Sequence, residues 1–574
     1  MDMKQKIAEN IAQCAAACYE GCGLCCEDLM QMIEIPPDKK LGDFALPCFR
    51  LSKSLRKAPQ MIATGLAEKL CCAEIERVEV VGGYLNIFLK RSNMAAGIVE
   101  AVLSKPGRWG SSNVGEGKTV CLDYSSINIA KRFHIGHLST TMIGHSLKRI
   151  YDFNGYKTVG INHLGDWGTQ FGKMICAYKK WGNHEEVEQG GVQAMVDLYV
   201  RFHAEAEKDP SLEDEGRAWF KKIEDGDPEA MAIFSWFKEV TLKDTQRVYD
   251  MLGVSFDSYN GEAFYNDKME PVVDELREKG LLVESQGAQV VNLDDYNMPP
   301  ALVLRSDGAT LYITRDLAAA FYRHNEYKFD KCLYVVAYQQ NLHFRQLFKI
   351  LELMGHEDWS RGMEHVSFGM VSYEGRALST REGYVVYLED LLNKAVEKAR
   401  EIIEEKSPNL PNKDEVARQV GVGAVVYFDL HNERIKDIDF CWDRALSFDG
   451  ETGPYVQYTH ARCCSVLRKA QAAGMSMAGA DFASLNDDEA LDVLMLIARF
   501  PEVVRKSMEI NEPYLITRHT TSLAQAYNKY YFEHRIMDEN DAAGTSARLA
   551  LTDAVRDVIK TGLYLIGVEA PERM

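Results

Sequence analysis

No apolar run in the 574-residue sequence approaches the length of about 20 residues that a membrane-spanning helix needs. The opening residues, MDMKQKIAENIAQ, are charged and amphipathic and lack the apolar stretch of a secretory signal. Short repeats and low-complexity tracts are also missing. These absences argue against membrane and secreted classes, so we expect a globular, cytoplasmic protein without a membrane partner.

A secreted disulfide framework is missing too, although the sequence contains 14 cysteines. Several are adjacent in the chain, as in Cys25-Cys26 and Cys463-Cys464, which suits reduced thiols in the cytoplasm. Cys14, Cys18 and Cys22 recur at intervals of four, a spacing that permits either a zinc site or one packed helix stripe. Because no paired C-x-x-C knuckles or partner histidines follow, we expect packing, no zinc and no metal held by side chains.

Basic residues are outnumbered by acidic ones, and the net charge is −19. Nucleic-acid affinity depends on neutralised phosphates, so any nucleic-acid site on this chain must be local. One candidate is RLSKSLRK, in which Arg50, Lys53 and Lys57 would share a face if the segment were helical. A solvated helix face explains the same pattern equally well.

The length and a hydrophobic content of 46% predict several packed domains rather than one. We expect an N-terminal α+β domain (1–112), which contains a strand pair in VEVVGGYLNIFLK, and a C-terminal all-α helical bundle (441–574). Between them, residues 113–440 read as an α/β domain, with a helical insertion near 176–260 and later strands in ALVLRS, KCLYVVAY and EHVSFGMV. The order strand (TVCLDY), helix (138–153) and strand (KTVGI) predicts a Rossmann-like parallel sheet.

The segment SSINIAKRFHIGHL lies between the first of these strands and its helix, where open parallel sheets bind ligands. Gly136 lets a ligand approach the backbone, while His134 and His137 can donate hydrogen bonds to phosphate oxygens. A metal-binding histidine pair and two helix-capping histidines are the alternatives. Nucleotide chemistry explains the glycine as well, which neither alternative does.

These residues resemble the arginyl-tRNA synthetases, a branch of the class I aminoacyl-tRNA synthetases. The HIGH signature is present at 134–137, and the surrounding SSINIAKRFHIGHL differs from the family pattern at Ile127, where proline is usual. The resemblance continues through NHLGDWGTQFG, TRDLAAA, QQNLHF, ETGPYVQYTHAR and the terminal PERM, and so covers essentially the whole chain.

The resemblance implies a ligase that activates arginine with ATP and Mg²⁺ to an adenylate, and then transfers arginine to the terminal adenosine of tRNA(Arg). It also implies a monomer. Positioning and charge stabilisation catalyse such displacement at phosphorus. The positions carried over from the family for ATP binding and catalysis are Lys131, His134, Gly136 and His137.

A pocket for arginine must offer carboxylates and acceptors to a planar cation. The family pattern places it at Asp123, Ser126, Asn128, Tyr312, Asp316 and Gln340. Asp316 is the expected partner of the guanidinium, with Tyr312 packed beside it and Asn128 on the amino-acid backbone. The alternative for Asp316 is a simple interaction with a helix dipole.

The second class I signature, K-M-S-K-S, has lost both lysines, since GMVSYEGRALSTREG occupies its place with Ala377 and Thr380 at those positions. Ser379 is retained and Arg381 is a neighbouring cation, so both are candidate catalytic residues. In this family the lysine before the HIGH signature, here Lys131, is expected to take over. A plain polar turn is the alternative.

For tRNA binding, the N-terminal domain offers Tyr84 and Asn86, which match nucleotide-contacting positions of the family. The C-terminal bundle offers Tyr527, Asn528, Tyr530 and Met574 for the anticodon, because aromatic rings can stack on unpaired bases. Tyrosines at helical spacing are more often core residues. Two rival functions also stay open: an adenylyltransferase acting on a small acid, and a catalytically inactive tRNA-binding relative.

Overall fold

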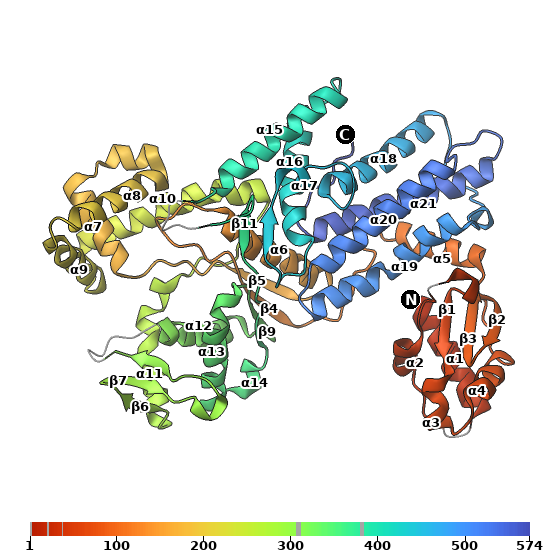
Figure 1. Cartoon of the computed structure of the whole chain (residues 1–574), viewed down its shortest axis with the longest axis horizontal. Coiled ribbons are helices and arrows are strands. Elements are labelled where there is room, and N and C mark those ends of the chain that lie inside the picture. Colours follow the sequence, from red (N-terminus) through yellow and green to blue (C-terminus); the bar gives the residue numbers. More distant parts are fainter. Residues whose placement is uncertain (1–2, 20–21, 37, 306–311, 379–383) are drawn as a thin grey trace.

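The computed structural model describes residues 3–19, 22–36, 38–305, 312–378 and 384–574. It has a central α/β domain, a helical C-terminal bundle and an N-terminal domain that stands apart from the catalytic sheet (Figure 1). This confirms the predicted fold class. Within the described ranges, no helix is long and apolar enough to cross a membrane.

The N-terminal domain packs helices on one small antiparallel sheet of order β1-β3-β2. The predicted strand pair is present, because β2 and β3 form a hairpin that turns at Gly82 and Gly83, both with positive φ. The elements are α1 (Met3–Cys18), α2 (Cys26–Met32), η1 (Lys39–Leu41), β1 (Phe44–Pro47), η2 (Cys48–Leu51), α3 (Ser52–Leu55), α4 (Pro59–Ala67), β2 (Ile75–Val81) and β3 (Tyr84–Leu89).

Helix α5 (Arg91–Leu103) follows this domain but packs against the C-terminal bundle. Arg91 pairs with Asp488 at 3.1 Å, and the Trp109 indole donates to the Ile497 carbonyl at 2.8 Å. The segment 91–112, which we assigned to the first domain, therefore lies on the bundle. The three sequence-based domain ranges otherwise stay predictions.

The catalytic sheet is four-stranded and parallel, of order β10-β9-β4-β5. Its βαβ unit is the predicted one: β4 (Thr119–Asp123) ends one residue before the predicted strand TVCLDY, and α6 (Leu138–Phe153) and β5 (Lys157–Ile161) have the predicted bounds. Asn154 and Gly155 end the helix, since Gly155 adopts φ 86°, a left-handed conformation that suits glycine. The other two strands are β9 (Lys331–Tyr334) and β10 (Met363–His365).

The insertion is helical, as predicted, with α7 (Thr169–Trp181), α8 (His184–Ala206), α9 (Ser211–Glu224) and α10 (Pro228–Leu252). The ALVLRS segment corrects one expectation: its strand β8 (Ala301–Leu304) joins β6 (Leu282–Ser285) and β7 (Ala288–Val291) in a separate antiparallel sheet. Periodicity finds a strand but not its partners. Around this sheet lie η4 (Glu262–Lys268), α11 (Met269–Glu278), η5 (Asp294–Tyr296), α12 (Tyr312–Tyr327), η6 (Tyr338–Gln340), α13 (Asn341–Leu353) and α14 (Glu357–Ser360).

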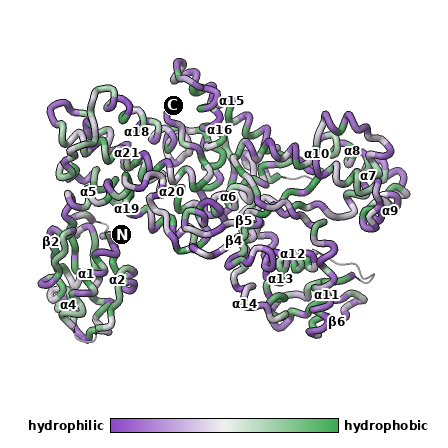
Figure 2. The backbone as a smooth tube through the Cα atoms, turned by 180° about the vertical axis from the view of Figure 1, so that it is seen from behind, coloured by the Kyte–Doolittle hydropathy of each residue, from purple (hydrophilic) through white to green (hydrophobic). Residues whose placement is uncertain are grey.

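A third small sheet, β12-β11-β13, connects the catalytic domain to the bundle. It contains β11 (Val371–Tyr373), β12 (Arg376–Ala377) and β13 (Ile438–Phe440), with α15 (Leu388–Lys406), α16 (Lys413–Leu430) and α17 (Trp442–Ala445) around it. The free end of α15 is mostly hydrophilic (Figure 2). The bundle itself is formed by α18 (Gly453–Ala472), η7 (Phe482–Ser484), α19 (Asp488–Glu509), α20 (Tyr514–Glu533) and α21 (Ala542–Leu565).

Candidate active site and nucleic-acid interface

The chain between β4 and the HIGH turn has an unusual backbone. Ser125, Ser126 and Ala130 adopt φ of 70°, 45° and 61°, a region that non-glycine residues enter at a cost on the order of 1–3 kcal/mol each. Hydroxyl groups stabilise this path, because Thr140 Oγ1 accepts the Ser125 N–H at 3.0 Å and Thr241 Oγ1 accepts the Ala130 N–H at 3.1 Å. Such strain is typical of ligand-binding segments, and no sequence pattern had identified the two threonines.

The two histidines of the HIGH turn are both in the Nε2–H tautomer, because each Nδ1 accepts a backbone hydrogen bond. His134 Nδ1 accepts the Gly136 N–H at 3.1 Å, and His137 Nδ1 accepts the His134 N–H at 3.2 Å. Burial lowers the pKa of His134 to about 4, and burial together with the neighbouring His134 lowers the pKa of His137 to about 3. At pH 7 both rings are therefore neutral, with the proton on Nε2, which is free to donate to a ligand.

Both histidines cap the turn, and the His134 ring itself leaves little room for a side chain at position 136, so the capping alternative also accounts for the glycine, contrary to our expectation. A Cβ atom added to Gly136 would lie 2.9 Å from Cε1 and 3.0 Å from Nδ1 of that ring. Lys131 is exposed, and its charge contributes to the lowered pKa of both histidines. Ser379 and Arg381, the candidates from the second signature, lie outside the described residues.

Asp316 lies near the start of α12, between two histidine side chains. One carboxylate oxygen is 2.6 Å from His343 Nε2 and the other is 4.0 Å from His163 Nε2. The Tyr312 ring is 4.7 Å from the His343 ring, and the charge of Asp316 and burial raise the Tyr312 pKa. In the described part of the chain no lysine or arginine pairs with Asp316, so its carboxylate is available for a cationic ligand.

Asp123, in contrast, already has a cationic partner. Its Oδ2 lies 2.7 Å from the guanidinium of Arg323, and both side chains are buried. The other oxygen accepts a hydrogen bond from Ser126 Oγ at 2.8 Å. Because Arg323 offsets its charge, Asp123 can orient Ser126 and the site but offers a ligand guanidinium little net charge.

Glu262, at the start of η4, is a further acidic residue near Asp316, and the sequence had not identified it. Burial raises its pKa to about 7; Arg315 opposes that rise, while Asp316 and Asp166 add to it. Asp166 is fully buried and pairs with Lys238 at 2.7 Å. A cation placed beside Glu262 would favour its ionised form.

Asn128 and Gln340 are both exposed at the same edge of the sheet. Asn128 forms a parallel bridge with Gly165, and a Cβ on Gly165 would lie 2.1 Å from Asn128 Oδ1. This contact brings the NHLGDWG segment onto the strained chain before the HIGH turn. Gln340 ends η6 directly after β9, next to the strand that contains Asp123.

In the N-terminal domain the structure separates the two predicted tRNA residues. Tyr84 is half-buried, with its ring 5.4 Å from the exposed Phe49 in an edge-to-face contact. Asn86 is only 3% exposed and cannot reach a nucleotide, which corrects that prediction. The face expected for RLSKSLRK is also interrupted, because Arg56 adopts φ 49° and ends α3 before Lys57.

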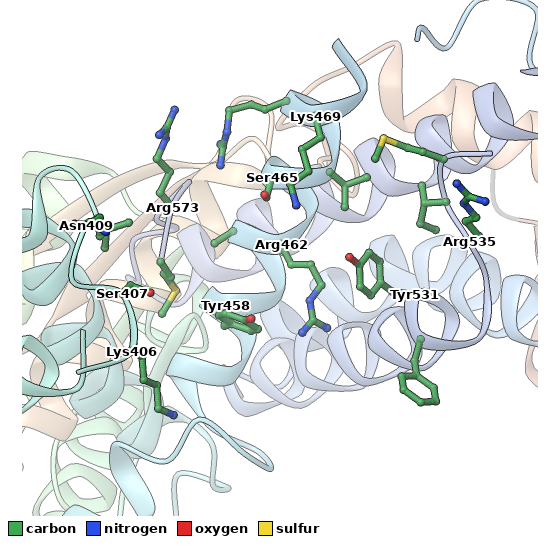
Figure 3. A pocket seen from close by; sticks show the side chains of 18 of the residues that line it. Lys406, Ser407, Asn409, Tyr458, Arg462, Ser465, Lys469, Tyr531, Arg535 and Arg573 are labelled. Atoms are coloured by element: carbon green, nitrogen blue, oxygen red, sulfur yellow. The ribbon is translucent and has the colours of Figure 1, made fainter. Parts of the chain in front are cut away.

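A basic cavity of about 1170 Å³ lies between the C-terminal bundle and the segment 406–411, and is bounded by that segment, α18, the end of α20 and the C-terminal tail (Figure 3). The guanidinium of Arg462 lies between two aromatic rings, 5.0 Å from Tyr458 and 5.1 Å from Tyr531. Met574 lines the same cavity, as predicted for a tRNA-facing residue. The basic side chains around it are Lys406, Arg462, Arg468, Lys469, Arg535 and Arg573, and Glu533 and His534 also line it.

Three other predicted tRNA residues do not face this cavity. Tyr527 and Tyr530 are 0% and 1% exposed, so the packing alternative holds for both. The Tyr527 hydroxyl donates to Thr552 at 3.0 Å inside the bundle. Asn528 is half-buried and hydrogen-bonded to both Thr459 and Arg462. It therefore helps to orient Arg462, which lines the cavity. Helical spacing alone could not tell these rings from the neighbouring Tyr531.

All 14 cysteines are free thiols. Cys14 and Cys18 donate to the carbonyls of Lys69 and Gly65, which fits packing on α4. Across the described ranges, the single group of three or more side chains close enough to hold a metal ion is Asp487, Glu489 and His534. That group lies in the bundle, and the Glu489 carboxylate is already paired with Lys529 at 3.1 Å.

The parallel sheet and the two-histidine turn fit the class I aminoacyl-tRNA synthetases. Three family models match the chain in order: Arginyl tRNA synthetase N terminal domain (1–89), tRNA synthetases class I (R), catalytic domain (98–442), and DALR anticodon binding domain (456–574). The chain belongs to the arginyl-tRNA synthetase family.

Curated relatives match over nearly the whole length. The arginine–tRNA ligase of Alkaliphilus metalliredigens is 54% identical over 574 residues, covering 100% of both chains. The arginine–tRNA ligase of Clostridioides difficile is 53% identical, with 96% of each chain covered. Among solved structures, arginyl-tRNA synthetase from Thermus thermophilus aligns with a TM-score of 0.82 at 25% identity, covering 100% of both chains.

Proposed function

We propose that the protein is an arginine–tRNA ligase, which activates arginine with ATP and then transfers it to tRNA(Arg). One observation carries the proposal: the HIGH turn presents two neutral imidazole donors, and Asp316 presents a carboxylate that contacts histidines but, among the described residues, no lysine or arginine. The imidazoles suit phosphate oxygens and the carboxylate suits a guanidinium. The full-length relatives of the same printed activity support it.

In the activation step, the arginine carboxylate attacks the α-phosphorus of ATP and pyrophosphate leaves. His134 and His137 donate hydrogen bonds from Nε2–H to phosphate oxygens, while Gly136 allows the ligand close to the backbone. Lys131 supplies the cation that the second signature lacks at Ala377. Ser379 and Arg381 stay candidates for the same role.

Mg²⁺ bound to ATP would offset the charge of the departing pyrophosphate. The described residues around His134 include no group of three acidic or histidine ligands close enough to one another to hold a metal. We therefore assign Mg²⁺ to the nucleotide and derive no step from a metal held by the protein.

The arginine pocket is proposed to hold the guanidinium between Asp316 and Glu262, with Tyr312 packed on its face. Asn128 and Gln340 are exposed toward the same edge and can bind the amino-acid backbone. Asp123 has an indirect role: Arg323 and Ser126 fix its carboxylate, and Asp123 in turn orients Ser126. Discrimination against neutral analogues then depends on Asp316 above all, because Asp123 is already neutralised.

For tRNA, the basic cavity beside Arg462 is the proposed anticodon site, with Tyr458, Tyr531 and Met574 as contacts for unpaired bases. Tyr84 and Phe49 offer a second contact on the N-terminal domain. This combination, absent from a simple adenylyltransferase, disfavours that rival. A cytoplasmic location and a monomeric state stay predictions.

Arginine-dependent ATP–pyrophosphate exchange, measured with purified protein and saturating tRNA(Arg), tests the proposal. We expect exchange with arginine that falls at least about 100-fold with citrulline, since a charged pair is lost. Exchange that is independent of the amino acid supplied would overturn the assignment. Absence of any exchange would favour the inactive tRNA-binding rival.

A further inference from the structure

The HIGH turn is bound along its backbone to the chain that follows residues 379–383. Ile135 N–H donates to the Val386 carbonyl at 2.9 Å, and Leu388 N–H donates to the Phe133 carbonyl at 2.9 Å. His134 and Tyr387 thus face each other in an antiparallel bridge. The main chain of His134 is held in register by a segment far away in the sequence.

The side chain of Arg132 reinforces this bridge. Its guanidinium carbon lies 3.7 Å from the centre of the Tyr387 ring. One guanidinium nitrogen is 3.7 Å from Asp390 Oδ2, and another donates to Gln193 Oε1 at 3.4 Å. The side chain is only 22% exposed. A stacked, partly desolvated guanidinium with polar partners at its edge has one preferred orientation.

We propose that Arg132 is a positioning residue for arginine activation, acting through Tyr387 to fix the backbone of the HIGH turn. The inference rests on the proposed function, because it concerns the step in which His134 meets phosphate. The role of Arg132 is positioning rather than catalytic, because its guanidinium is engaged by Tyr387, Asp390 and Gln193.

Arg132 directly follows Lys131, the proposed phosphate-binding cation. Lys131 and Arg132 are adjacent cations, yet only Lys131 is exposed. With Arg132 held on Tyr387, Lys131 is the cation left to face the nucleotide. The bridge also fixes the backbone from Val386 to Leu388 against the HIGH turn.

The test uses the full-length protein in the exchange assay with saturating tRNA(Arg). Arg132→Met keeps the aliphatic contact but removes the planar cation, and Tyr387→Leu removes the ring. Each change should lower kcat for exchange by about three- to 30-fold, the range expected for a desolvated cation–π contact. KM for arginine should stay within about twofold, and Tyr387→Phe should retain activity because the ring remains.

The double variant Arg132→Met/Tyr387→Leu separates positioning from general damage. A direct contact predicts that the double variant is no worse than either single variant, because the same interaction is lost once. Arg201→Met is the matched control, since Arg201 stacks at 4.9 Å on Trp181 in the helical insertion and should leave exchange unchanged.

Three results would overturn the inference: activity of Arg132→Met within about twofold of the wild type, additive losses in the double variant, or a loss that simply follows the melting temperature. Failure of the proposed function looks different. In that case the wild-type protein itself shows no arginine-dependent exchange.

Discussion

Arginine binding should be linked to release of a proton from Glu262. Burial holds the pKa of this carboxyl group at about 7 in the absence of substrate, against an ordinary value of 4.5. A guanidinium placed beside it favours the ionised form and lowers its pKa. Binding therefore strengthens as the pH rises through 7 and levels off above that value, where the carboxylate is already ionised.

The size of the effect follows from the pKa. If only the ionised form binds well, about one molecule in ten is competent at pH 6 and about nine in ten at pH 8, so Kd for arginine should fall about tenfold between these values. The groups around Glu262 are Arg315, Asp316 and Asp166. Asp166 pairs with Lys238, and Asp316 contacts His343 and His163.

Isothermal titration calorimetry at pH 6, 7 and 8, in buffers of different ionisation enthalpy, measures both Kd and the protons released. Glu262→Gln is the matched control: it keeps the shape, cannot ionise and should bind with a nearly flat pH profile. A flat profile in the wild-type protein would refute the reasoning. A tenfold slope that persists in Glu262→Gln would assign the proton to another group.

Three further predictions concern substrate charge, phosphate and tRNA. Asp316→Asn should raise KM for arginine at least about 30-fold and abolish discrimination against citrulline, because a desolvated charge pair is worth about 2–5 kcal/mol; unchanged discrimination in the exchange assay would indicate a helix-dipole role. Lys131→Ala should slow single-turnover adenylate formation about 100-fold while arginine binding, followed by calorimetry, changes little; a rate within about threefold of wild type refutes it. Arg462→Met should raise KM for tRNA(Arg) in aminoacylation about three- to 30-fold with exchange at saturating tRNA intact, and a defect equal in both assays would indicate loss of folding instead.

Local patterns predicted the elements of the catalytic sheet well. The helix 138–153 and the strand 157–161 have the expected bounds because the apolar periodicity and the Asn154-Gly155 stop agree with each other. The strand in ALVLRS was also found, but its place in a separate sheet was not, since strand partners depend on contacts distant in sequence. Helix α5 was assigned to the wrong neighbour for the same reason.

The site residues that belong to a local motif could be predicted, and those brought in by tertiary contacts could not. His134, Gly136 and His137 form a contiguous motif, and the structure brings them together as a motif should. Glu262 and Arg323 come from segments without a motif, and only tertiary contact shows that one supplies a carboxyl group while the other neutralises Asp123. Burial likewise decided between Tyr527, which is in the core, and Tyr531, which lines the basic cavity.

The most direct test of the central claim is charging of tRNA(Arg) with labelled arginine by the purified protein in the presence of ATP and Mg²⁺. We predict acid-precipitable arginyl-tRNA that accumulates in proportion to enzyme, requires ATP and is lost in His137→Ala. Absence of charged tRNA(Arg), in a preparation that is folded and that binds both ATP and tRNA, would contradict the account.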